Sequence, residues 1–164
     1  MMKRLIWSIV VGWGVVWGSA AVPVLSAGPD AVVVITNAGN PASDLSMAQL
    51  ALIYQGRKSS WEDGRPIVPV NRAVDSEARR IFYQRVLRSE PTRKFFLPGS
   101  PIPLSLVVQP SALGVKRFVA NAPGAIGYLL LSELGDDLEG VKVISVDGIR
   151  PNEQTAAAGS YKLQ

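Results

Sequence analysis

An uninterrupted run of apolar residues near the start of this chain constrains its fold more than any other segment. Residues 31–36 read Ala-Val-Val-Val-Ile-Thr, with no alternation between apolar and polar positions. A strand with one solvated face alternates, whereas a strand buried on both faces is apolar throughout. The run therefore predicts a strand in the middle of a parallel-type sheet that helices cover on both sides.

The segments that follow alternate between helix and strand. Ser46 and Gln49 form a capping-box pattern that begins a helix, and Gly56 is suited to end it in a left-handed conformation. Residues 67–71 are expected to form a second strand. Pro69 within it favours an edge position or an early break in the hydrogen-bond ladder.

A second helix is predicted from Asp75 or Ser76 to about Arg88, because either residue can act as its N-cap. Its apolar positions fall on one side, and its arginines are assigned to a solvated face with Arg93 and Lys94. The apolar positions are Ala78, Ile81, Phe82, Val86 and Leu87, and the arginines are Arg79, Arg80, Arg85 and Arg88. The four prolines in residues 98–110 then predict a long irregular connection.

The last third of the chain continues the alternation. Ser111 can cap a third helix that runs to residue 121, and residues 125–131 and 141–146 are expected to be strands. Asp147 and Gly148 follow as a tight turn. The whole pattern predicts an α/β fold with a mixed, mostly parallel sheet flanked by helices.

The hexapeptide Pro123–Tyr128 contains two glycines that bracket two apolar residues. Gly124 and Gly127 permit backbone angles and close approaches that a Cβ atom would block, and Pro123 stops the preceding helix. Trp61 is expected to anchor the polar loop of residues 57–66 on the core. Taken alone, the hexapeptide is explained by an ordinary corner between a helix and a strand.

The first 27 residues resemble an export signal. Lys3 and Arg4 precede an apolar stretch of residues 5–17, and small residues follow, so cleavage is expected after Ala21 or Ala27. An uncleaved membrane anchor is the alternative, because residues 5–28 carry no charge and are long enough to span a bilayer. The expected organisation is a signal peptide at residues 1–27 and one domain at residues 28–164, in the periplasm.

The composition excludes several kinds of chemistry. The chain has no cysteine and no histidine, which removes disulfides, thiol chemistry, the Ser-His-Asp triad and the commonest metal ligand. Without Lys3 and Arg4 the formal charge falls from +4 to +2, which is too small an excess to indicate a nucleic-acid surface. We therefore expect no enzyme, no cofactor, no metal site and no nucleic-acid partner.

The passage from the second strand into the second helix has the composition of an anion site. The free N–H groups and the dipole of a helix favour negative charge at its start. Ser76 can donate its hydroxyl there, and Arg72, four residues earlier, can donate two parallel hydrogen bonds to an oxyanion. The plainer interpretation is that Ser76 is only a cap and that Arg72 pairs with Asp75 at the surface.

With these motifs in place, the chain resembles the phosphate-binding, periplasmic solute-binding proteins of ABC uptake systems, which have the type II two-lobed fold. Order and spacing agree across most of residues 32–161. The matching stretches are Leu50–Gly56, Trp61–Gly64, Val70–Arg72 with Ser76 and Phe82, Phe118–Val119 with Pro123–Tyr128, and Ser145–Gly148.

The resemblance implies an oxyanion-binding loop at residues 72–78. The family has an arginine and, four positions later, a serine followed by glycine and threonine. Arg72 and Ser76 match the first two, while Glu77 and Ala78 occupy the glycine and threonine positions. Glu77 adds a negative charge that competes with an anion for the helix start, and Ala78 lacks a hydroxyl donor.

All matched stretches belong to one lobe of the two-lobed family, so a single lobe is expected. One lobe cannot enclose an ion, and an exposed ion pair is weak because water screens it. The first hypothesis is an exported domain that binds phosphate or a similar oxyanion, with a membrane ABC permease, a sensor protein or a second copy as partner. The alternative is a ligand-free periplasmic module for protein interaction or sensing.

Overall fold

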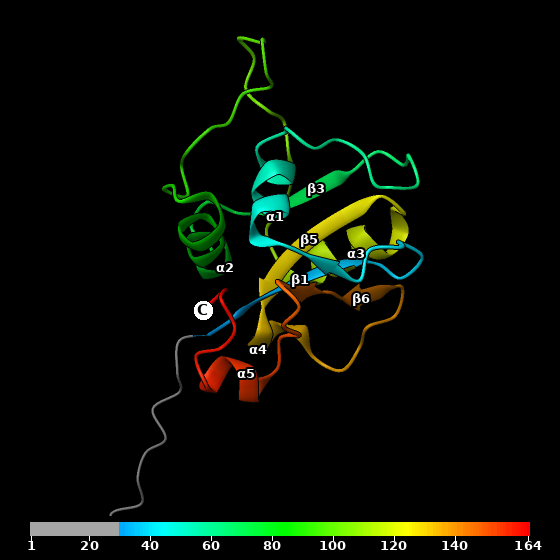
Figure 1. Cartoon of the computed structure of the whole chain (residues 1–164), viewed down its shortest axis with the longest axis vertical. Helices are drawn as coiled ribbons and strands as arrows, with labels where there is room; N and C mark the ends of the chain where they lie inside the picture. The colour runs from blue at the N-terminus through cyan, green and yellow to red at the C-terminus, as the bar shows by residue number, and fades with distance from the viewer. Residues whose placement is uncertain (1–29) are drawn as a thin grey trace, which may run out of the picture.

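The computed structural model describes residues 30–164, and the predicted signal peptide lies outside these residues. The chain forms three layers, with a five-stranded sheet between helices on either side (Figure 1). The strands are β1 (Val32–Asn37), β2 (Asp44–Leu45), β3 (Val68–Arg72), β4 (Val107–Gln109), β5 (Ala125–Leu130), β6 (Val141–Val143) and β7 (Ser145–Val146). The helices are α1 (Met47–Tyr54), α2 (Glu77–Phe82) with the π-helix η1 (Tyr83–Leu87), α3 (Ala112–Asn121), α4 (Leu131–Leu134) and α5 (Glu153–Ala157).

The main sheet has the order β4-β3-β5-β1-β6, and β2 pairs with β7 in a separate parallel ribbon. Strand β3 is parallel to β4 and to β5, while β1 is antiparallel to both of its neighbours, β5 and β6. The predicted mixed, mostly parallel sheet is therefore confirmed, with β1 as the reversed strand. Pro69 lies in an interior strand, so the predicted edge position is wrong, whereas the alternative, an early break in the hydrogen-bond ladder, is confirmed. It sits where β3 changes partners, from β5 at residues 68–69 to β4 at residues 70–72.

Strand β1 is buried on both faces, as its apolar run predicts, and successive side chains enter two separate cores. Val32 and Val34 belong to the core under α1 and α2, whereas Val33 and Ile35 belong to the core under α3. All four are fully buried. The strand thus holds both helical layers on one sheet, at a gain of about 1.5–3 kcal/mol for each buried aliphatic side chain.

The predicted helix starts are confirmed by their hydrogen bonds. The Ser46 hydroxyl accepts from the Gln49 N–H at 3.1 Å, and the Gln49 side chain accepts from the Ser46 N–H at 2.8 Å, which completes the capping box. Gly56 follows α1 with φ of +69°. Ser111 accepts from the Gly114 N–H at 3.1 Å to begin α3.

Two segments depart from the sequence prediction. The proline-rich connection of residues 98–110 contains strand β4, which forms the edge of the main sheet beside β3. The single strand predicted at residues 141–146 is divided into β6, which pairs with β1 in the main sheet, and β7, which pairs with β2 in the separate ribbon. The turn at Asp147 and Gly148 is confirmed, with φ of +51° and +76°.

Among residues 30–164, no helix combines the length and the apolar character that crossing a bilayer requires.

The two glycines of the hexapeptide allow close contacts between elements, as predicted, but neither has a left-handed backbone. A Cβ atom on Gly124 would lie 2.1 Å from the Pro66 carbonyl oxygen, and one on Gly127 would lie 2.6 Å from a methyl group of Val115. The predicted anchor is also present, since the Trp61 indole N–H donates to the Gly124 carbonyl at 2.9 Å. The hexapeptide therefore joins the 57–66 loop and α3 to the sheet.

We expect Gly124→Ala to lower the free energy of unfolding by about 3 kcal/mol, the upper end for overpacking, because the clash is with backbone that cannot rotate away. Equilibrium unfolding in urea measures the change. Gly39→Ala is the control, because its Cβ atom would meet only the Asn37 side chain, at 3.3 Å. Equal losses in the two variants would contradict the contact described here.

Candidate functional site

The candidate site lies where β3 and β5, two parallel neighbours, reach their carboxyl ends. Arg72 is the last residue of β3, and the loop of residues 73–76 leads from it into α2. Strand β5 passes directly into α4, which carries Glu133. Parallel strands bring their carboxyl ends to one edge of the sheet, where α/β proteins commonly bind ligands.

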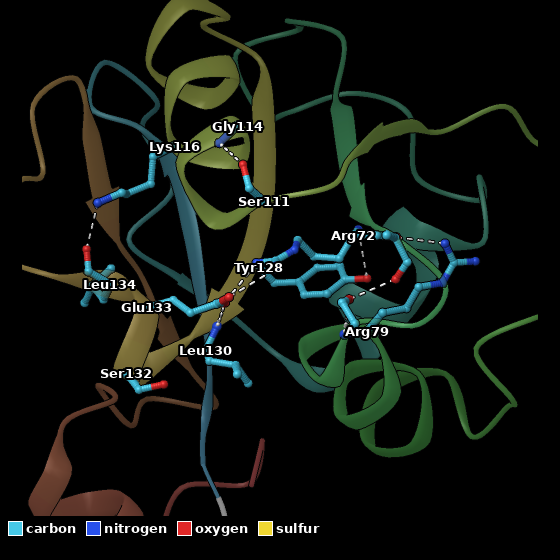
Figure 2. A network of polar contacts seen from close by, with 12 residues as sticks. Arg72, Arg79, Ser111, Gly114, Lys116, Tyr128, Leu130, Ser132, Glu133 and Leu134 are labelled. Atoms are coloured by element: carbon cyan, nitrogen blue, oxygen red, sulfur yellow. Dashed lines mark hydrogen bonds and ion pairs between the residues drawn. The ribbon is translucent and has the colours of Figure 1, made fainter.

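Arg72 makes a bidentate ion pair with Glu133 across this edge (Figure 2). The two terminal nitrogens of the guanidinium lie 2.8 Å and 3.1 Å from the two carboxylate oxygens. The Arg72 side chain is 6% exposed and that of Glu133 30% exposed. Arg72 thus pairs with a carboxylate from another element, and not with Asp75.

The other predicted site residues have separate contacts. Ser76 is the N-cap of α2: its hydroxyl accepts from the Arg79 N–H at 3.3 Å and donates to the Ala73 carbonyl at 2.9 Å. Glu77 is exposed and pairs with Arg80 on the same helix. Ala78 is buried in the core. No hydrogen bond within residues 30–164 joins Ser76 to the Arg72 side chain, so these two predicted binding groups have separate partners.

A buried polar network supports the end of β3. Tyr128 on β5 donates to the Asn71 side-chain oxygen, and the Asn71 amide donates to the Tyr83 hydroxyl at 2.8 Å. The Arg72 N–H faces both the Asn71 oxygen, at 3.0 Å, and the Tyr128 hydroxyl, at 3.4 Å. Burial raises the pKa of Tyr128 above its ordinary value, so this hydroxyl remains a neutral donor. The network fixes the backbone from which Arg72 extends.

Arg79 was assigned to the solvated face of the second helix, and this prediction is wrong. Its side chain is buried, and its guanidinium donates to the Arg72 carbonyl and the Pro91 carbonyl, each at 2.9 Å. It also lies over the Tyr83 ring, 4.7 Å from the centroid. Figure 2 shows Arg79 on the opposite side of the Arg72 backbone from Glu133. In the sequence, only the four-residue spacing between Arg79 and Tyr83 indicated that these two side chains lie on the same face of the helix.

Glu133 is the residue that sequence reasoning missed. It lies 61 positions from Arg72, and no motif links the two. Burial raises the pKa of Glu133, while the hydrogen bonds from Arg72 and from the Leu130 N–H, together with the Arg72 charge, lower it, and the net result is a pKa below the ordinary value. The carboxylate is therefore ionised near neutral pH and accepts the hydrogen bonds of the Arg72 guanidinium that an anion would accept.

Comparison with known proteins places the chain in a family. The family model described as a PBP superfamily domain matches residues 24–164, so the chain belongs to the periplasmic-binding-protein superfamily. Over 140 residues it is 33% identical to the phosphate-binding protein PstS of Bacillus subtilis, an alignment that covers 81% of this chain and 42% of PstS.

Solved structures support the same fold. An ABC-type phosphate transport receptor from Vibrio cholerae superimposes with a TM-score of 0.67 at 22% identity, over 82% of this chain and 53% of that protein. A substrate-binding protein from Clostridium perfringens, crystallised with bound phosphate, gives 0.64 at 26% identity, over 81% and 51%. The chain therefore spans about half the length of these relatives, as expected for one lobe, and it resembles the phosphate-binding component of ABC transporters.

We expect protein stability to depend on the ionisation of Glu133. Because folding lowers its pKa, the ion pair stabilises the protein above the unfolded value of about 4.3 and is lost as pH falls through the folded value. Glu133→Gln should unfold at a lower urea concentration at pH 7 and show a shallower loss of stability between about pH 5 and pH 3. Urea unfolding at several pH values measures both effects.

Glu139→Gln is the matched control, since Glu139 is exposed and lies outside the site. If Glu133→Gln and Glu139→Gln lose stability with the same dependence on pH, the ion pair makes no contribution.

Proposed function

We propose that this chain is an exported solute-binding domain that binds phosphate or a similar small oxyanion at the carboxyl end of β3. Arg72 is the principal donor, and Ser76 with the first N–H groups of α2 forms the neighbouring part of the site. The ligand competes with Glu133 for Arg72. The domain acts as a receptor in transport and not as an enzyme.

The observation that carries this proposal is the bidentate Arg72–Glu133 ion pair. A carboxylate presents two oxygens at the spacing that a phosphate or sulfate ion also offers, so the guanidinium is already oriented for an oxyanion. The Arg72 Nε is buried and has no hydrogen-bond partner within residues 30–164, which leaves one further donor at the site. Its relatives support the ligand class, because PstS of Bacillus subtilis is named as a phosphate-binding protein.

Because Glu133 already binds Arg72, we expect the domain alone to bind an oxyanion weakly. A ligand must displace a carboxylate that is bound within the same chain, and Glu77 adds a negative charge at the start of α2. We propose that a membrane ABC permease or another partner covers the site in use, because exclusion of water strengthens ion pairs.

The second candidate function is a ligand-free module for protein contact or sensing. The specific observation that favours it is the same pair: with Arg72 satisfied by Glu133, Ser76 serving as a cap and Ala78 facing the core, the site is complete without a ligand. In this function the pair is a structural connection between β3 and α4.

Calorimetric titration with phosphate and sulfate distinguishes the two functions. We expect millimolar affinity in the wild-type domain and at least tenfold tighter binding in Glu133→Gln, because removal of the internal anion leaves Arg72 available. Arg72→Met should abolish the heat in both backgrounds. Glu139→Gln makes the same change of charge outside the site and should bind as the wild type does.

Tighter binding in Glu133→Gln that is lost with Arg72→Met supports the oxyanion receptor. If the wild type and Glu133→Gln both give no heat at millimolar ligand while remaining folded by circular dichroism, the ligand-free module is the correct function.

A further inference from the structure

A cavity lined by three cationic side chains lies on the other side of the Arg72 backbone from Glu133. It has a volume of about 260 Å³ and lies between α2 and the connection that precedes β4. We infer that this cavity, which we call the β4 pocket, binds an organic anion: a carboxylate or phosphate ester attached to a small apolar group. The inference does not require that the Arg72 site bind a ligand.

The first observation is a buried arginine without a counterion. Arg79 is 8% exposed, and within residues 30–164 its side chain donates hydrogen bonds only to two carbonyl oxygens, of Arg72 and Pro91. Carbonyl oxygens satisfy the donors but carry no full negative charge. None of the ion pairs within residues 30–164 includes Arg79. A buried charge is costly without an opposite charge nearby, so an anion in the adjoining cavity would stabilise it.

The second observation is that the remaining charges of the cavity have the same sign. Arg93 and Lys94 line the β4 pocket together with Arg79, and no carboxylate is among the lining residues. Neither Arg93 nor Lys94 takes part in an ion pair within the described chain. Three cations around one small cavity produce a positive potential that attracts an anion.

The third observation concerns the rest of the wall, which is apolar. Phe95, Leu104, Leu106 and Val108 complete the cavity, with Ser105 and the Tyr83 ring beside them. A bare inorganic ion would leave these surfaces against water, whereas a ligand with an aromatic or short aliphatic group would cover them. The volume is slightly below the range of about 300–1,000 Å³ for drug-sized ligands, which restricts the apolar group to about one ring.

Benzoate and phenyl phosphate are suitable probes, and benzamide is their uncharged counterpart. In calorimetric or NMR titrations of the full chain at low salt, we expect both anions to bind saturably and benzamide to bind at least tenfold more weakly. The double variant Arg93→Glu with Lys94→Glu should weaken benzoate binding at least tenfold. Both residues are exposed, so these changes do not disturb the core.

Arg117→Glu is the control for charge reversal outside the cavity, because Arg117 is exposed on α3 and does not line the β4 pocket. It should change benzoate affinity less than twofold. Ser105→Trp retains all three cations but fills the cavity, and should also weaken benzoate at least tenfold.

The inference is overturned if neither anion binds saturably up to 10 mM, which corresponds to a binding free energy of about 2.7 kcal/mol. It is also overturned if benzamide binds as tightly as benzoate, or if the double variant and Arg117→Glu bind benzoate with the same affinity. Phosphate titrations of Glu133→Gln report on Arg72, while benzoate titrations report on Arg93 and Lys94. Failure at one site therefore leaves the result at the other intact.

Discussion

The arrangement of the whole domain depends on the burial of β1 on both faces. Its side chains alternate between two cores, so α1 and α2 must cover one side of the sheet and α3 the other. Strand β1 is antiparallel to β5, while β3 and β5 are parallel to one another. Their carboxyl ends then meet at one edge, and the chain that leaves β5 delivers Glu133 to Arg72. The Arg72–Glu133 pair thus follows from the parallel pairing of β3 with β5.

Two guanidinium groups lie at the end of β3, Arg72 from the strand and Arg79 from α2. Each is a buried positive charge, and the two are stabilised by different contacts. Arg72 is neutralised by a carboxylate of its own chain, whereas Arg79 donates only to carbonyl oxygens and to the face of an aromatic ring. The buried network of Asn71, Tyr83 and Tyr128 holds the backbone between them. The end of β3 therefore has an arginine paired with a carboxylate on one side and an arginine without a counterion on the other. A substitution of Asn71 would therefore alter the positions of both guanidinium groups.

Much of the fold was predictable because its signals are local. The capping box of α1, the left-handed glycine after that helix and the turn at Asp147 each involve residues within a few positions, so local backbone geometry and hydrogen bonding specify them. Strand β4 was missed because three residues between prolines carry little signal of their own, and pairing with β3 decides their conformation. Pro69 predicted either an edge position or a break in the ladder, and only the assembled sheet shows that it lies where β3 changes partners.

The sequence by itself determined the α/β class, the strand buried on both faces and the helix caps, since apolar periodicity and capping act over short distances, and its motifs indicated the family to which the chain belongs. Only the tertiary structure decided what Arg72 and Arg79 contact. Glu133 is 61 positions away from Arg72, and Arg79 faces inward because the Arg72 and Pro91 carbonyls lie within its reach. The partner of a charge is set by the elements that folding brings beside it, and this information is spread over the whole sheet.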